Sequence, residues 1–502
     1  MNKTKKTFFN TLATTIQMIV MQLISLLVSR KVLSVYGSDL NGVNAILSNV
    51  MDWIMLLEGG LTTASNVALF KPFVNKDYIQ CNRILSATKK RFNQIGLLVF
   101  ICGFGMAIVY PFFINTGIRQ LDIFLMFTMM TMSTSFSVFY TRKYALMLNV
   151  SQSEYINTIL GVAVSIVGNA AIFLVAYLGL NYLWIRVIYL AITVVNGLVV
   201  AIVVRQRYKF ISFKEEPDFE AIKGTRDVVF QKLTGLLRTS APLVFISMMV
   251  SAMYASVYSV YVFIYGFVRK IILMVVTATQ SGIGQLIAER DTDSVYKVFR
   301  VFEYTSTLAV FLMMSVAIPM TMPFIRFYTR NVTDINYIDY WILVYMVVDI
   351  STQVLHVPSG IVINMSGKFK EDRNFQIVSI TVLVVAVLTL GTIMGFYGLL
   401  IGIALSSLVL AVQEIHYTRS KIFKKSYWDF FKPILVNTGF LIIPVAFEMR
   451  GIPQELNLIL FGISGIALVI CNTLVLLAGN YIFERERLMS LVSRVKSILI
   501  KR

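Results

Sequence analysis

Four basic side chains interrupt long apolar stretches of the sequence, and the chemistry open to them is the binding of anions. They are Arg30, Arg238, Arg269 and Lys270. A charge at the centre of a membrane-spanning helix costs roughly 2.5–3.5 kcal/mol on insertion scales, so such residues usually serve a function in a hydrated interior. Arginine also offers a planar fork of donors that can hold a phosphate at two points. We therefore predict that these cations line a hydrated interior, where they are available to an anionic ligand.

Each of these cations also has a simpler interpretation. Arg30 and its neighbour Lys31 are expected late in the first helix, from which both side chains could extend to the lipid headgroups. Arg238 is expected close to the opposite interface. Arg269 and Lys270 are expected midway along a long helix, and for these two we favour a position in a cavity.

Three acidic residues, Asp52, Glu58 and Asp349, are expected at a similar depth. Two interpretations remain open for them. Each carboxylate either forms a buried ion pair with one of the cations, or binds H⁺ or Na⁺ and couples transport to an ion gradient. We favour ion pairs, because a buried carboxylate opposite an arginine needs no further role.

Apart from H⁺ or Na⁺, no metal or cofactor is predicted. Cys81, Cys102 and Cys471 lie far apart in the sequence, and the only histidines are His356 and His416, so neither a disulfide nor a zinc site is expected. Nucleophilic triads, phosphate-binding loops and glycine-rich dinucleotide turns are also missing. We therefore predict no catalytic residues and no enzymatic activity.

The elements that must position these residues are membrane-spanning α-helices. The 502 residues are 57% hydrophobic and only 14% charged, against about 25% charged in soluble domains. In lipid the backbone must bond to itself, which leaves helices or a closed barrel, and barrel strands show short alternating segments. Apolar runs such as Ile95–Tyr110 and Ile377–Met394 are long and unbroken, so we predict an all-α integral membrane fold.

Runs of about 20 apolar residues predict about fourteen spans. The first six are Phe8–Val35, Asn41–Phe70, Ile95–Ile114, Leu121–Met147, Tyr155–Gly179 and Leu183–Val204. The next six are Val228–Val250, Tyr254–Ala288, Glu303–Pro323, Ile338–Ile363, Ile377–Met394 and Gly398–Tyr417. The last two are Phe431–Glu448 and Leu456–Tyr481.

Basic residues gather at one end of these spans, which predicts that this end is cytoplasmic and that both termini lie there. The basic residues expected at the opposite ends are Arg30, Lys31, Arg119, Arg186, Arg326, Arg330 and Arg450. The net charge of +19 follows from this asymmetry, because basic loops lie against anionic headgroups. We therefore predict contact with membrane lipids and no nucleic-acid partner.

The spans are predicted to form two lobes of six helices and an additional pair. We place the N-lobe at 1–204, a cytoplasmic linker at 205–226, the C-lobe at 227–419, the last two spans at 420–481 and a basic cytoplasmic tail at 482–502. The turn at Val35–Ser38 is similar to the turn at Met253–Ser256, six spans later, which predicts a parallel repeat. Tyr78–Phe92 and Arg485–Lys501 are expected to be helices on the headgroup surface, with a solvated tail as the alternative for the second.

Several segments resemble bacterial polysaccharide flippases, the Wzx-type O-antigen and capsule repeat-unit translocases. They are Tyr36–Asn44, Leu57–Gly60, Ala68–Pro72, Ala278–Ala288 and Ser366–Lys370. These flippases belong to a superfamily that also contains multidrug and toxic-compound extruders and lipid II flippases. The resemblance implies two six-helix lobes that rock between inward-open and outward-open states around a central cavity. It also implies a bacterial cytoplasmic membrane and an undecaprenyl-pyrophosphate-linked oligosaccharide as substrate.

The lipid II branch has cavity arginines on its first and eighth helices, and Arg30 and Arg269 match these roles by helix position. The resemblance further suggests other polysaccharide assembly proteins as partners. Two rival functions remain. A multidrug or small-molecule exporter fits twelve spans better than fourteen. A membrane polysaccharide polymerase or glycosyltransferase would need a sizeable external loop or a catalytic acid, and neither is obvious in the sequence.

Overall fold

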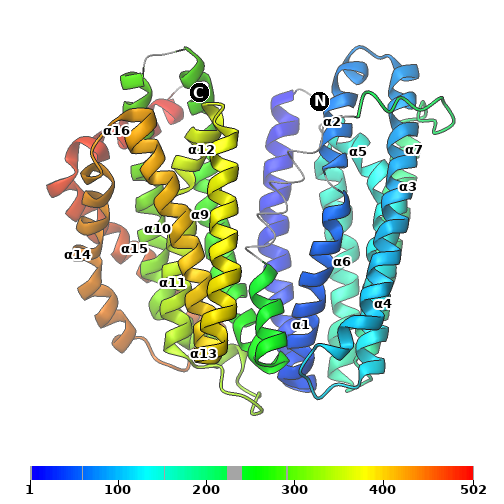
Figure 1. Ribbon diagram of the computed structural model, residues 1–502, viewed down its shortest axis with the longest axis horizontal. Helices are drawn as coiled ribbons and strands as arrows, with labels where there is room; N and C mark the ends of the chain where they lie inside the picture. The colour runs from blue at the N-terminus through cyan, green and yellow to red at the C-terminus, as the bar shows by residue number, and fades with distance from the viewer. Residues whose placement is uncertain (1–2, 59, 152, 223–239, 290–291, 501–502) are drawn as a thin grey trace. The chain divides into compact units, whose positions relative to one another are not determined.

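The computed structural model describes residues 3–58, 60–151, 153–222, 240–289 and 292–500, and in these ranges every regular element is helical. Eleven helices of this part are long and apolar enough to cross a membrane. The chain divides into two compact units, Met1–Ser256 and Val257–Arg502, called here the N-terminal and C-terminal units. Within each unit the long helices lie side by side (Figure 1). The all-helical membrane fold predicted from the sequence is confirmed.

Large apolar side chains cover the outer surface of these helices. Val167 is 71% exposed, Phe447 71% and Ile393 77%. Monomeric proteins in water rarely expose contiguous apolar surface on this scale, whereas lipid tails accept it. The protein is therefore a multi-pass membrane protein whose apolar surface faces lipid.

The N-terminal unit is assembled from long helices and shorter pieces. Its α-helices are α1 (Lys3–Ile54), α2 (Leu61–Val74), α3 (Tyr78–Val109), α4 (Gln120–Phe136), α5 (Arg142–Val150), α6 (Glu154–Tyr177) and α7 (Leu183–Arg207). The helix α1 packs against α6, α3 packs against α4, and α7 packs against both α4 and α6. A π-helical turn, η3 (Ser137–Thr141), joins α4 to α5, so the predicted fourth span is continuous.

Two pairs of predicted spans are joined by a single glycine in a non-helical conformation. Gly37 (φ 81°) interrupts α1, and Gly395 (φ 59°) interrupts α13 (Phe369–Tyr417). A positive φ is accessible to glycine at little cost, which explains why glycine occupies both breaks. Ser379 and Ser406 exchange hydrogen bonds of 2.8–2.9 Å across the second break, so the two halves of α13 form an antiparallel hairpin. The span limits predicted at these two places are confirmed.

The predicted second span is broken, which the sequence analysis did not anticipate. After Ile54 the chain forms a short 3₁₀ helix, η1 (Met55–Glu58), and α2 begins only after Gly60. Breaks of this kind within the membrane are tolerated where the freed backbone groups find partners inside the protein. Here the backbone N–H of Thr62 donates to the Glu58 carboxylate at 3.1 Å. Glu58 therefore caps the start of α2.

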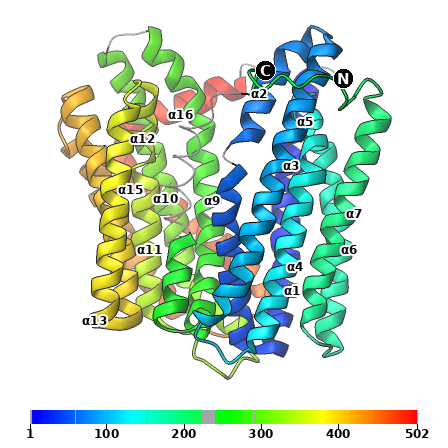
Figure 2. The same ribbon diagram turned by 45° about the vertical axis from the view of Figure 1, so that its right-hand side comes forward.

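Residues 208–222, called here the strap, follow α7 and lie along the beginning of α3 (Figure 2). Asn82 holds the strap at two points: its amide donates to the Phe210 carbonyl at 2.8 Å, and its Oδ1 accepts from the Ser212 N–H at 2.9 Å. Gln80 donates to Asp218 at 2.8 Å. The Gln80 amide and the Ala221 N–H donate to the Asp218 carboxylate, and they lower its pKa.

The prediction that Tyr78–Phe92 is a separate helix on the headgroup surface is wrong. These residues form the first part of α3, which continues without interruption to Val109. Ile84 and Leu85 are buried in a core that includes side chains of the strap. An amphipathic pattern beside basic residues is typical of a surface helix. In this protein the strap, and not the lipid headgroup layer, covers the apolar face of the first part of α3.

The segment before α9 (Ala252–Glu289) is joined to the N-terminal unit. A short helix, Ser240–Met249, precedes it. Asn115 donates to the Val250 carbonyl and accepts from the Ala252 N–H, both at 3.0 Å. An added Cβ on Gly42 of α1 would lie 1.8 Å from the Ala252 carbonyl oxygen, so the two backbones touch. The start of α9 is therefore packed directly against α1.

The C-terminal unit contains the rest of α9 together with the remaining helices. These are α10 (Thr292–Tyr328), α11 (Tyr340–Leu355), α12 (Val357–Met365), α13, α14 (Trp428–Gly451), α15 (Leu458–Phe483) and α16 (Arg485–Ile500). The last two predicted spans, α14 and α15, pack against α10. The buried side chain of Asn480 joins the three helices, since it donates to Asn437 at 2.6 Å and accepts from Tyr304 at 2.9 Å.

Two further sequence expectations concern the C-terminal unit. The predicted tenth span is divided into α11 and α12 at His356, and Pro358 stands in the first turn of α12, where its missing N–H is not needed for a helical hydrogen bond. The predicted tail helix forms as α16. Its Arg487 is buried and bonded to Asp429 of α14 at 2.7 Å, so the beginning of α16 is anchored to protein.

Candidate functional site

Asp349 of α11 is the centre of a buried polar cluster in the C-terminal unit. Its side chain accepts hydrogen bonds from Ser407 at 2.7 Å, from Gln353 at 2.8 Å and from Tyr345 at 3.4 Å. The hydroxyl groups of Tyr345 and Tyr258 lie 3.3 Å apart. The cluster brings together side chains of α9, α11 and α13. Its oxygen atoms are of the kind that bind Na⁺, and the carboxylate can also accept a proton.

Arg269 of α9 faces this cluster, whereas Lys270 does not. The Arg269 side chain is half-buried, and its charge interacts with the Asp349 carboxylate. Its Nε atom is buried and has no hydrogen-bond acceptor among the described residues. Lys270, the next residue, is exposed. The structure thus brings together two of the predicted site residues, Arg269 and Asp349, and separates Lys270 from them.

Glu58 takes part in a different pair, in the N-terminal unit. Its Oε2 lies 2.7 Å from Nη1 of Arg142 on α5, and Thr62 donates to Oε1 from both its N–H and its hydroxyl group. The Glu58 side chain is 9% exposed and that of Arg142 31%. The carboxylate therefore ties the broken second span to α5.

The other predicted site residues lie apart from these clusters. Asp52 is exposed on α1, and Arg30 is partly buried on the same helix. The Lys31 ammonium lies 5.5 Å from the centre of the Tyr177 ring at the end of α6, a position that suits a side chain extending toward an interface. Arg238 lies outside the described residues.

Arg186 is a buried cation that the sequence analysis counted only among the basic residues of the predicted outer ends. It lies in the first turn of α7 and is 9% exposed. It donates to Asn44 of α1 and lies 5.9 Å from the centre of the Tyr189 ring. Its Nε has no hydrogen-bond partner, and within the described ranges no carboxylate forms an ion pair with it. The available signal was its place just inside an apolar run, after Trp184 and Ile185.

Buried pairs elsewhere in the C-terminal unit connect helices. Arg419, which is fully buried, binds the Glu303 carboxylate of α10 and donates to the Ser426 carbonyl at 2.8 Å. His356 and Glu414 are 2.8 Å apart between the α11–α12 junction and α13. These groups have protein partners, which suits a structural role.

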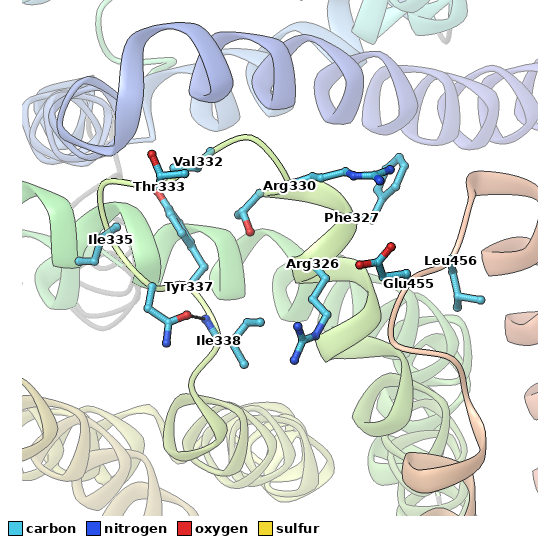
Figure 3. A pocket seen from close by; sticks show the side chains of 12 residues that line it. Arg326, Phe327, Arg330, Val332, Thr333, Ile335, Tyr337, Ile338, Glu455 and Leu456 are labelled. Carbon is cyan, nitrogen blue, oxygen red and sulfur yellow. Dashed lines mark hydrogen bonds between the residues drawn. The ribbon is translucent and has the colours of Figure 1, made fainter.

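A pocket of about 500 Å³ lies at the end of the C-terminal unit where α10 ends. The loop after α10 and the connection between α14 and α15 complete its wall (Figure 3). Arg326, Arg330 and Glu455 supply its charges, and the two arginines are exposed. No ion pair joins these three residues in the described part of the chain, so the pocket carries an excess of positive charge.

Comparison of the whole chain with known proteins gives matches at the level of structure. No protein-family model matches the chain, and no curated protein matches it in sequence. The lipid II flippase MurJ in an inward closed conformation is similar, with a TM-score of 0.67 and 14% identity, over 94% of this chain and 98% of that one.

Two structures of multidrug resistance transporters of the MATE family, described as members of the MOP superfamily, are also similar. The inward-facing one has a TM-score of 0.62 at 14% identity and covers 84% of this chain and 96% of that one. The outward-facing one has a TM-score of 0.53 at 16% identity and covers 86% and 96%. At such low identity the likeness concerns the fold alone, and the chain folds like MurJ and these MATE transporters.

Proposed function

We propose that the protein is a flippase for lipid-linked oligosaccharides. It would move undecaprenyl-pyrophosphate-linked repeat units from the cytoplasmic to the outer leaflet of a bacterial cytoplasmic membrane, by alternating access, for the synthesis of a surface polysaccharide. Other polysaccharide assembly proteins are the partners expected for this role. The observation that supports this proposal most directly is Arg186, a buried arginine whose described contacts are with uncharged side chains.

A buried guanidinium group without a counter-ion favours an anionic ligand. Leaving a charge buried and unpaired is costly, and a phosphate can relieve that cost through two charge-assisted hydrogen bonds. Asn44 and Tyr189 orient the Arg186 side chain but carry no compensating charge. Arg269 of the C-terminal unit likewise retains an unbonded Nε. Both features suit a pyrophosphate-bearing substrate better than a cationic drug.

The extent of the structural match favours the flippase over the rival exporter. Because MurJ matches 94% of the chain, the unmatched part is shorter than α14 (24 residues) and α15 (26 residues) together. The match therefore includes at least part of this additional pair. The MATE transporters cover 84–86% of the chain. MurJ is described as a lipid II flippase, and a related lipid-linked substrate is what we propose here.

The energy source belongs to the same proposal. Asp349 is held by three hydrogen bonds and by the charge of Arg269. One role for it is structural, because its hydrogen bonds join α11 to α13 and its charge acts on Arg269. The other is the binding of H⁺ or Na⁺, which would couple flipping to an ion gradient.

The test is a flipping assay with the purified full chain in proteoliposomes. A polyprenyl-pyrophosphate-linked oligosaccharide with a fluorescent sugar is placed in both leaflets, and a membrane-impermeant reductant bleaches the outer one. With the protein present, nearly all fluorescence should bleach, against about half without it. Arg186→Met should slow flipping at least tenfold, while Arg450→Met, which removes an exposed arginine, should leave the rate unchanged.

Two further readouts distinguish the rivals. Uptake of a cationic dye by the same vesicles, without flipping of the lipid, would show that the protein is an exporter and not a flippase. Lengthening of the glycan in the presence of the protein would instead indicate a polymerase or a glycosyltransferase. An equal flipping rate for wild type and Arg186→Met would contradict the role in substrate binding that is proposed for Arg186.

A further inference from the structure

A second group of cations lies at the opposite end of the N-terminal unit from Arg186, where α3, α5, α7 and the strap meet. Its members are Lys89 of α3, Lys143 of α5 and Arg205 in the last turn of α7. The positive-inside pattern assigns this end to the cytoplasm. None of the three has a part in the proposed function as described above.

Lys143 is the most buried of the three, with 9% of its surface exposed. Its ammonium lies 5.1 Å from the ring centre of Tyr140, 5.5 Å from that of Tyr144 and 5.8 Å from that of Phe213. Aromatic faces attract a cation and keep it in place, but they do not neutralise its charge. The rings therefore fix the position of the Lys143 ammonium but do not compensate its charge.

The two neighbouring cations increase the positive charge of this place. The Lys89 ammonium lies 5.6 Å from the centre of the same Phe213 ring. The Arg205 guanidinium lies 5.2 Å from the centre of the Tyr144 ring and donates to the Tyr144 hydroxyl at 2.5 Å. Both charges act on Lys143, and both repel it.

No carboxylate balances this group in the part of the chain that the structure describes. Lys89, Lys143 and Arg205 have no ion pair there. The Glu58 carboxylate of the same unit is already bound by Arg142 and Thr62. Three like charges around shared rings repel one another, and a bound anion would relieve this repulsion. The arrangement thus has the composition of an anion-binding site.

The site is built on parts that hold their positions. Tyr144 is buried in the core of the N-terminal unit, and Phe213 and Tyr140 pack against that core. Phe213 belongs to the strap, whose preceding residues are bonded to Asn82 of α3. Pre-positioned donors bind a ligand with little loss of conformational entropy.

We propose that Lys89, Lys143 and Arg205 form a binding site for the phosphate group of a membrane lipid. The ends of membrane spans lie at the level of the headgroups, where lipid phosphates are abundant. The phosphate has two sources: an anionic phospholipid of the surrounding leaflet, or a polyprenyl pyrophosphate. In the second case the site is the first contact of the substrate, and this reading rests on the proposed flippase function.

Binding is tested first with inorganic pyrophosphate as a soluble probe. The thermal unfolding of the purified full chain in a neutral detergent is followed while pyrophosphate is titrated at constant ionic strength. The wild type should show a saturable rise in Tm. Lys143→Met should weaken the apparent affinity at least tenfold, and Lys90→Met, which removes an exposed lysine next to Lys89 on α3, should not weaken it.

Two results would overturn the site. One is a wild type whose Tm does not respond to pyrophosphate, and the other is an equal response in wild type and Lys143→Met. If Lys143→Met does not fold, Lys89→Gln and Arg205→Gln take its place, and each should weaken binding at least threefold. A purely structural role for the cations predicts instead that every variant loses stability equally with and without pyrophosphate.

The source of the phosphate is separated by lipid composition. Wild type and Lys143→Met are placed in nanodiscs of neutral lipid, of neutral lipid with phosphatidylglycerol, or of neutral lipid with polyprenyl pyrophosphate, and bound lipid is counted by native mass spectrometry. Retention of phosphatidylglycerol by the wild type alone identifies a headgroup site. Selective retention of polyprenyl pyrophosphate identifies a substrate site. If wild type and variant retain both lipids equally, the proposed lipid site is rejected even if the protein flips its substrate. If polyprenyl pyrophosphate is retained selectively but is not flipped, only the proposed flippase function is rejected.

Discussion

Ser407 of α13 donates a 2.7 Å hydrogen bond to Asp349 of α11, whose carboxylate also interacts with the charge of Arg269 on α9. Three helices are thereby connected through one buried carboxylate. Asp349→Asn should lower the Tm of the protein, because Arg269 is then left without its counter-charge. The double variant Asp349→Asn with Arg269→Met should lose less stability than the sum of the single variants. Thermal unfolding in detergent measures the coupling, with the exposed Lys270→Met as the control, and strictly additive losses would argue against the pair.

The same pair decides between a structural and an ion-coupled role for Asp349. If the carboxylate couples flipping to a gradient, the wild type should flip faster when an H⁺ or Na⁺ gradient is imposed across the proteoliposome membrane. Asp349→Asn should then flip at the same rate with and without the gradient. A gradient-independent rate in the wild type itself would leave Asp349 with the structural role alone.

Arg269→Ala is expected to abolish flipping of a lipid-linked oligosaccharide while the amount of protein in the membrane stays normal. Arg269 is half-buried and keeps one unbonded donor, so it can bind a substrate phosphate in addition to Asp349. Arg269→Lys retains the charge without the planar fork and should retain only part of the rate. The exposed Lys270→Ala should behave as the wild type, and normal flipping by Arg269→Ala would contradict the prediction.

Glu58→Gln should destabilise the N-terminal unit by about 2 kcal/mol. Removing one partner of a fully buried ion pair costs roughly 3–5 kcal/mol, and the 31% exposure of Arg142 reduces this value. Asp52→Asn, an exposed carboxylate on the preceding helix, should change stability very little. Chemical unfolding of the two variants, followed by tryptophan fluorescence, provides the comparison. Equal stability of both would show that the Glu58 pair contributes nothing.

Asn82→Ala should release the strap from α3, since it removes both hydrogen bonds that hold residues 210–212. Trypsin should then cut after Lys209 or Lys214 several times faster than in the wild type. The exposed Asn93→Ala on the same helix is the matched control.

The contact between Gln80 and Asp218, which also holds the strap, should respond to pH. Because the pKa of Asp218 is lowered, its contribution is present at neutral pH and is lost as the pH falls through that lowered value.

The spans could be predicted from the sequence because two local signals define them. Long apolar runs set the approximate number of helices, and Gly37 and Gly395 stand where the chain must leave the helical conformation. The broken second span could not be predicted in the same way. Its break is stabilised by Arg142, which is 84 positions away from Glu58, and no local pattern reports such a partner.

The candidate site residues likewise divide into those that local sequence signals predicted and those that depend on distant parts of the chain. Arg269 and Asp349 were found because a charge inside an apolar run stands out, and their proximity is a property of the packed helices. Arg186 and Lys143 were missed as site residues because their positions near helix ends suggested exposure, whereas neighbouring helices and the strap bury them. Burial near a helix end depends on what covers that end. The covering segment is encoded elsewhere in the chain.

The boundary between the two compact units falls between Ser256 and Val257, inside the unbroken helix α9. The first residues of α9 are packed against α1, while its remaining 33 residues belong to the other unit. A proline at this boundary, as in Val257→Pro, would therefore remove a backbone hydrogen bond from the interior of α9 and should lower the Tm of the protein.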